Sequence, residues 1–225
     1  MINKYWENLP DYLNGENANI LCVVDTSGSM TGEPIESVKV GLSDMIASLR
    51  LDPYALETAC ISIITYDRDV KQLIPLTELE NLQLPEITVP ESGPTFMGAA
   101  LELLCECYDK EVNMGSYEQK GDWMPLLFVL TDGKPSDIQA YEVAIQKVKQ
   151  HQFTNIVACA AGPKAKIEPL KKLTNNVFTL DTMDSNTFKK FFQWVTINVQ
   201  QGGRTMGVTD VIELPAPPIE INVVI

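Results

Sequence analysis

The sequence predicts an α/β protein with a doubly wound, mostly parallel, twisted sheet, one antiparallel edge strand and helices on both faces. Two observations predict this class. Short apolar runs typical of buried strands alternate along the chain with segments whose apolar residues recur every three or four positions. Two of the runs, 58–66 and 70–76, are joined by three polar residues, which indicates a hairpin and therefore one antiparallel pair.

The individual elements follow from the same patterns. In helix 34–51, apolar residues from Ile35 to Leu49 keep the spacing of one buried face, and Pro34 suits a first turn. Asp184 and Ser185 predict the cap of a final helix rich in phenylalanine. The remaining predicted strands are 18–25, 126–131, 155–160 and 177–180, and the remaining predicted helices are 97–113, 136–152 and 167–173.

These elements divide the chain into three parts: an N-terminal extension (1–17), one α/β domain (18–200) and a proline-containing C-terminal tail (201–225). Gly202 and Gly203 predict a loose joint after the final helix. In 219–225, apolar and other residues alternate as in a half-buried strand. We expect this strand to pack on its own domain or on a neighbouring copy, with ordering only on a partner as the alternative.

Composition excludes several classes of partner. The chain of 225 residues carries 30 acidic residues against 17 Lys plus Arg, a net charge of −13. This surface repels phosphate backbones and anionic membranes, so nucleic acid is not an expected partner. No apolar run approaches the roughly 18 residues that span a bilayer, so we expect no membrane insertion. The start of the chain lacks the apolar core of a signal peptide, and the five cysteines read as buried free thiols; both features predict a cytoplasmic protein.

Oxygen-bearing side chains follow three of the predicted strands or loops. Asp25, Ser27 and Ser29 come directly after the first strand, Thr95 precedes a helix, and Asp132 ends the strand 126–131. Carboxylate and hydroxyl oxygens are the ligands that hard cations such as Mg²⁺ prefer, and the carboxyl ends of parallel strands are where open α/β sheets bind ligands. Taken singly, each of these residues could instead be an ordinary helix cap or turn residue.

The three pieces together resemble the metal-ion-dependent adhesion site (MIDAS) of von Willebrand factor A (VWA) domains. The first motif of that family is Asp-x-Ser-x-Ser, completed by a Thr on a second loop and an Asp on a third, in this order. The likeness spans about 18–199. Further phrases resemble the bacterial tellurium-resistance (TerY-like) VWA proteins: 25–35, 75–79, 119–123 and the C-terminal 220–225.

The resemblance implies a function. Ser27, Ser29 and Thr95 would bind Mg²⁺ or Mn²⁺ directly, and Asp25 and Asp132 would bind it directly or through water. Three neutral hydroxyls and two carboxylates leave the ion incompletely satisfied, so an open position is left for a Glu or Asp of a partner protein. The implied role is a metal-dependent protein-binding module in a bacterial tellurite or stress-response system. Pro94 stiffens the turn that presents Thr95, where the family usually has small residues.

Two other classes of function stay open from the residues. A Mg²⁺-dependent phosphohydrolase would need a general base, and none is evident near Ser27 or Thr95. A Ser–His–Asp nucleophile would need His151, the one histidine, which lies at the end of a predicted helix away from the motif strands. We therefore expect no enzyme and no catalytic residues. The third class is a VWA scaffold that acts through its tail or another surface; the oligomeric state is not predicted.

Overall fold

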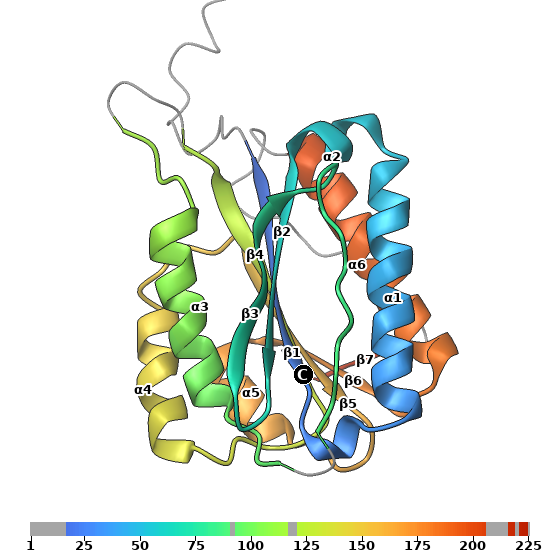
Figure 1. Cartoon of the computed structure of the whole chain (residues 1–225), viewed down its shortest axis with the longest axis vertical. Coiled ribbons are helices and arrows are strands. Elements are labelled where there is room, and N and C mark those ends of the chain that lie inside the picture. The colour runs from blue at the N-terminus through green and yellow to red at the C-terminus, as the bar shows by residue number, and fades with distance from the viewer. Residues whose placement is uncertain (1–16, 91–92, 117–120, 206–215, 219–220, 225) are drawn as a thin grey trace, which may run out of the picture.

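The computed structural model describes residues 17–90, 93–116, 121–205, 216–218 and 221–224. They form one seven-stranded sheet in the order β3-β2-β1-β4-β5-β6-β7 (Figure 1). The strands are β1 (Ala18–Asp25), β2 (Ala59–Tyr66), β3 (Val70–Glu78), β4 (Trp123–Thr131), β5 (Asn155–Ala161), β6 (Asn176–Leu180) and β7 (Ile221–Val223).

The pairing confirms the predicted fold class. Strands β2, β1, β4, β5 and β6 are parallel to one another, and β3 pairs antiparallel with β2 at one edge, as the hairpin pattern predicts. Every residue of β1 is buried, because helices cover both faces of the sheet.

Two helical layers enclose the sheet, as Figure 1 shows. Helices α1 (Glu33–Arg50) and α6 (Ser185–Thr205) cover one face, where they pack on alternate residues of β1 such as Cys22 and Val24. Helices α3 (Met97–Glu111), α4 (Ile138–Val148) and α5 (Ile167–Leu173) cover the other face, over Leu21 and Val23. The alternation of strand side chains thus divides the core into two layers.

Two helical features differ from the prediction. A short helix, α2 (Pro53–Thr58), follows α1, where the sequence pattern predicts no helix. Asp52 caps it by accepting hydrogen bonds from the amides of Tyr54 and Ala55. Helix α6 also runs through Thr205, so Gly202 and Gly203 lie in its last turns rather than in a joint. The cost of glycine in a helix, about 1 kcal/mol each, does not end the helix there.

The tail reaches the domain, which agrees with the prediction of a packed strand. Strand β7 pairs antiparallel with β6, Ile221 lies opposite Leu180, and the amide of Val224 donates to the carbonyl of Val177. Ile221 is buried in the core beneath α6. The described part of the tail therefore forms the second edge of the sheet, while the residues 219–220 and 225 of the predicted strand lie outside the described residues.

The five cysteines are free and buried. Within the described ranges, no helix is both long enough and apolar enough to cross a membrane.

Candidate metal site

The five predicted residues lie at the carboxyl end of the sheet, around the neighbouring strands β1 and β4. The chain leaves β1 towards β2 on one side and leaves β4 towards β5 on the other, so the sheet order reverses between these two strands. Such a reversal opens a crevice where α/β sheets bind ligands. The carboxyl end of β1 continues into the short 3₁₀ turn Gly28–Met30 before α1.

Asp25 is the buried anchor of the site, with 0% of its surface exposed. Its Oδ1 accepts the amide of Ser27 at 2.8 Å, and its Oδ2 accepts the hydroxyl of Thr131 at 2.7 Å. Burial raises the pKa of Asp25 to about 6, against the lowering effect of the bonds from Ser27 and Thr131, and the charge of Asp132 adds to the rise. A buried carboxylate with these constraints is oriented but short of compensating positive charge.

Ser27 and Ser29 present their hydroxyls next to each other and next to Asp132. Their Oγ atoms lie 3.3 Å apart, and Ser29 Oγ donates to Asp132 Oδ1 at 2.8 Å. Ser27 is buried, whereas Ser29 is exposed at the surface. Neither hydroxyl caps a helix: the 3₁₀ turn and α1 both begin without a side-chain cap bond, and Gly32 precedes α1 with a positive φ of 86°. The capping alternative for these two serines is therefore wrong.

Thr95 is held in place through its backbone. Its amide donates to Ser136 Oγ at 3.0 Å, and its carbonyl accepts the amide of Ser136 at 2.9 Å. Its Oγ1 makes no hydrogen bond with the described residues. This oxygen faces Gly133, and a Cβ built on that glycine would lie 3.7 Å from it. Helix α3 begins without a cap bond from the residue before it.

The first amides of α3 are satisfied from another element. Asp137, at the start of α4, accepts the amides of Gly98 and Ala99 at 3.1 and 2.9 Å. Thr95 is thus not needed as a cap, and its hydroxyl stays available. Asp137 thus caps the first turn of α3 and not that of its own helix.

Asp132 closes the group from the end of β4. It is buried, and burial raises the pKa of its carboxyl, against the lowering effect of the Ser29 hydroxyl. The carbonyl of Gly133 accepts the amide of Lys166, which ties this loop to the segment before α5. Two buried carboxylates with raised pKa values lie in one hydroxyl-lined site. A bound cation would therefore stabilise the ionised form of both.

The donor set fits a hard divalent ion. Hydrogen bonds or hydroxyl contact join four of the predicted residues, Asp25, Ser27, Ser29 and Asp132. The hydroxyl of Thr95 lies beside Gly133, the residue after Asp132. They supply oxygen only, which suits Mg²⁺ or Mn²⁺ better than soft ions. In the part of the chain that the structure describes, no cluster of three or more His, Cys, Asp or Glu side chains is arranged to hold a metal. A cation here would thus depend on the hydroxyls.

Three supporting residues were not predicted. Thr131 orients Asp25, Ser136 holds Thr95, and Asp67 links the first two loops: its Oδ2 accepts the hydroxyl of Thr26 at 3.3 Å and its carbonyl accepts the amide of Phe96 at 3.0 Å. Val24 of β1 lies opposite Leu130 of β4, and Asp25 and Thr131 are the residues that follow them. A correct alignment of these two strands would therefore have indicated Thr131 as a neighbour of Asp25. No signal in the sequence identifies Ser136 or Asp67.

His151 lies away from the site. It follows α4 at the end opposite to Asp137, where its ring bonds to the carbonyl of Lys147 and to Asp109 and packs against Tyr108. It therefore cannot act as the base of a serine nucleophile at Ser27 or Ser29.

Comparisons with known proteins agree with this architecture. Bovine (Bos taurus) matrilin-1 is 31% identical over 123 residues, which is 53% of this chain and 22% of matrilin-1. The proximal thread matrix protein 1 of the mussel byssus has a TM-score of 0.61 at 17% identity, over 81% of this chain and 46% of the mussel chain. The ArnB paralog VWA2 of Sulfolobus acidocaldarius has a TM-score of 0.56 at 16% identity, over 80% of this chain and 45% of that chain.

The chain spans less than half the length of each of these proteins, and the two structural likenesses show the fold alone. A further structure of the mussel protein has zinc in its MIDAS motif. The model of the von Willebrand factor type A domain matches residues 19–194, from β1 into α6. With the sheet, the helical layers and this match in agreement, the chain belongs to the VWA family.

Proposed function

We propose that this chain is a metal-dependent protein-binding module that grips a carboxylate of its partner through a divalent cation, Mg²⁺ or Mn²⁺. The ligands in this proposal are Asp25, Ser27, Ser29, Thr95 and Asp132. The observation that carries it is the gathering of these oxygens at the switch point of the sheet, with Ser29 exposed at the surface. A partner side chain has access to the site from that side.

Charge explains why such a site would attract a carboxylate. The set offers two carboxylates and three neutral hydroxyls, and each carboxylate is also engaged by a hydroxyl of the chain. A bound Mg²⁺ prefers six oxygens in octahedral geometry and would supply an electrophilic position for an external acidic oxygen. The residues of the chain orient the ligands and exclude water from the Asp25 side, where the carboxylate is buried.

The relatives support a divalent cation at this place, because the mussel protein of similar fold has zinc in its MIDAS motif. We choose Mg²⁺ or Mn²⁺ for this chain because its donors are oxygens alone. The absence of an acid–base pair near the hydroxyls among the described residues, with His151 at the far end of α4, favours binding over phosphoester hydrolysis.

The biological setting rests on the sequence resemblance to TerY-like proteins. We propose a bacterial, cytoplasmic protein of a tellurite or stress-response system, and the five buried free cysteines suit a reducing compartment. The net charge of −13 repels an acidic partner at long range, so the contact with it should be local and its association slow.

Affinity purification tests the proposal. Tagged wild-type protein and the Asp25→Ala variant are immobilised, and the same lysate is passed over each, once with Mg²⁺ and once with EDTA. Retained proteins are identified by mass spectrometry. The proposal predicts a partner that is retained only by the wild type with Mg²⁺, and lost when one Glu or Asp of the partner becomes Ala. A partner retained at full affinity in EDTA and by Asp25→Ala would instead indicate a scaffold that acts through another surface.

A further inference from the structure

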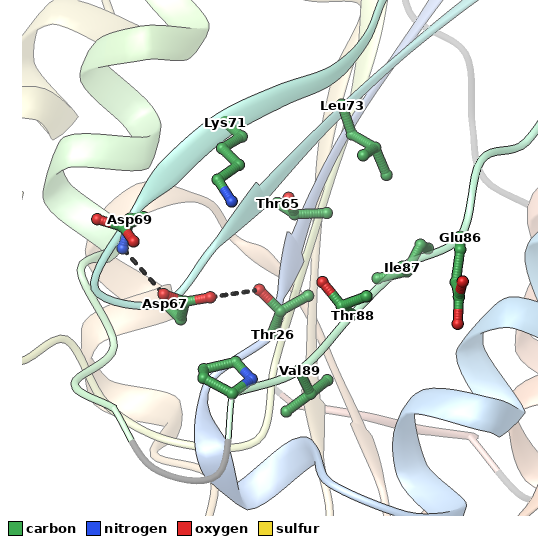
Figure 2. Close-up of a pocket in the computed structure, with 11 residues that line it drawn as sticks. Thr26, Thr65, Asp67, Asp69, Lys71, Leu73, Glu86, Ile87, Thr88 and Val89 are labelled. Atoms are coloured by element: carbon green, nitrogen blue, oxygen red, sulfur yellow. Dashed lines mark hydrogen bonds between the residues drawn. The ribbon is translucent and has the colours of Figure 1, made fainter.

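A polar pocket opens beside the proposed metal site, on the α1 side of the sheet. Figure 2 shows it between the edge of the sheet and the extended segment that leads to Thr95. Its volume is about 260 Å³. Thr26, between the proposed ligands Asp25 and Ser27, forms part of its wall, so the pocket shares a loop with the site.

The pocket lies where an extended segment, and not a helix, runs beside β2 and β3 (Figure 1). This segment, 79–90, buries Leu79, Leu82 and Ile87 in the core. Thr65 of β2 lies opposite Lys71 of β3, and both line the space that remains under this segment.

Thr65 offers an unused hydroxyl at the wall of the pocket. It belongs to a strand that is otherwise mostly apolar, and only 7% of its surface is exposed. It lines the pocket, yet its hydroxyl makes no hydrogen bond with any part of the chain that the structure describes. Asn19 Oδ1 is the only fully buried side-chain polar atom without a partner among the described residues, so the hydroxyl of Thr65 is reached by solvent through the pocket. It is therefore free to bind a ligand group that enters the pocket.

The charges around the pocket favour a cation. Three acidic residues, Asp67, Asp69 and Glu86, are among the residues that line it, against one basic residue, Lys71. None of these four groups forms an ion pair within the described residues. Asp67 is fixed in place, since its two oxygens accept the hydroxyl of Thr26 and the amide of Asp69 (Figure 2).

The size and the shape of the pocket limit which kind of cation it can hold. The volume lies below the range of about 300–1,000 Å³ that is typical of small-molecule sites. Leu73, Ile87, Val89 and Pro90 add apolar wall to the polar groups. An aliphatic stem that ends in a planar fork of donors fits such a space, because the carboxylate and hydroxyl oxygens are several separate acceptors.

We propose that this pocket binds an arginine side chain of the partner protein. The stem packs on the apolar wall, and the guanidinium donates to Asp67 and to the hydroxyl of Thr65. That this arginine belongs to the same partner as the acidic group at the metal rests on the proposed function; the affinity of the pocket for arginine does not. A nearby basic group would also offset the repulsion between an acidic partner and this acidic chain.

Nuclear magnetic resonance of the full chain tests the pocket separately from the metal. N-acetyl-arginine N-methylamide is titrated in EDTA while the amides of Thr26 and Thr65 are followed, and the uncharged citrulline analogue is the matched probe. We expect arginine to shift both amides and citrulline to bind about tenfold more weakly, as loss of a charge-assisted bond implies. Equal binding of the two probes, or no shift of either amide, overturns the proposal.

Variants of the pocket test whether it prefers a cation or an anion. Thr65→Val and the double change Asp69→Asn with Glu86→Gln should weaken arginine binding, whereas Lys71→Met should strengthen it. The control double change, Asp44→Asn with Glu106→Gln, removes the same charge from a half-buried position on α1 and an exposed one on α3, both away from the pocket, and should have little effect. If Lys71→Met weakens binding, or if the glutamate analogue of the probe binds better than arginine, the pocket takes an anion and the proposal is wrong.

Because EDTA is present in all arginine titrations, a failure of the wild type to bind arginine contradicts only the proposal for the pocket. Failure of Mg²⁺ to bind, measured without arginine, counts against the proposed function alone.

Discussion

The hydroxyl of Thr131, at the end of β4, donates to Asp25 Oδ2, at the end of β1, over 2.7 Å. The same hydroxyl accepts the amide of Gly133 at 3.1 Å. One buried threonine thus joins the first and third loops of the site and sets the direction of its most buried carboxylate. We regard Thr131 as a positioning residue, because its own oxygen is already engaged.

Replacement of Thr131 tests this positioning. Thr131→Val keeps the shape but removes both bonds, so Asp25 loses a partner. We expect the affinity for Mg²⁺ or Mn²⁺ to fall roughly 10- to 100-fold, as is usual when a residue behind a metal ligand is lost. Calorimetry measures it. Thr179→Val, on β6, is the matched control and should leave the affinity unchanged; equal losses in both variants would contradict a specific role.

The raised pKa of Asp25 predicts how stability depends on pH in the absence of metal. The folded-state value of about 6 lies above the reference value of 3.8, so the folded protein holds this proton more tightly than the unfolded chain. The stabilisation is full below about pH 4 and is lost as the pH rises through about 6. The Asp25→Asn variant should therefore exceed the wild type at pH 8 by on the order of 2–3 kcal/mol and approach it at pH 4.

Chemical denaturation of both proteins in EDTA, from pH 4 to 8, measures this difference. A difference in the free energy of unfolding that does not change with pH would contradict it. Added Mg²⁺ should reverse the order at pH 8, because the ion favours the ionised form that only the wild type has.

The strand β7 offers a test of how the tail contributes to stability. Ile221 is 3% exposed and Val223, on the same strand, is 49% exposed. We expect Ile221→Ala to lower the free energy of unfolding by roughly 2–5 kcal/mol, which is the range for a buried aliphatic side chain. Val223→Ala should change it by about 0.5 kcal/mol or less. Equal effects in thermal melts would mean that β7 does not dock in solution.

Gly98 sets how closely α3 approaches the start of α4. A Cβ at this position would stand 2.3 Å from the backbone nitrogen of Tyr141 and 2.6 Å from the carbonyl carbon of Ala140, so the two helices would have to separate. We expect Gly98→Ala to cost roughly 1–3 kcal/mol of stability. Gly133→Ala, where the nearest atom would be 3.7 Å away, is the control and should cost far less. A wild-type melting temperature for Gly98→Ala would contradict this packing.

Local signals explain which parts of the fold were predictable. The strands and helices around β1 follow from apolar runs and periodicity, and the hairpin follows from its polar link. Helix α2 was missed because Asp52–Pro53 both ends α1 and starts a new helix, and the pair alone does not distinguish these roles. The end of α6 was misplaced because two glycines lower helix propensity without deciding it; tertiary packing overrides such weak preferences.

The candidate site also has one part that was predictable from the sequence and one part that was not. The five oxygen-bearing residues lie in short motifs, so their types and order are visible in the chain. Ser136 and Asp67 hold the loops through contacts between elements that are distant in sequence, and those contacts exist only after folding. The pocket was likewise not predictable, because it depends on where segment 79–90 crosses the sheet.

Titration calorimetry of Mg²⁺ and of Mn²⁺ into the metal-free protein shows whether the five residues form a metal site. Wild type and Asp25→Ala are compared at neutral pH, with Asp44→Asn as a control for the loss of one carboxylate on α1 away from the site. We predict one bound ion in the wild type and in the control, and no measurable binding in Asp25→Ala although its circular dichroism shows an intact fold. Unchanged metal affinity in Asp25→Ala, or no binding by the wild type, would contradict it.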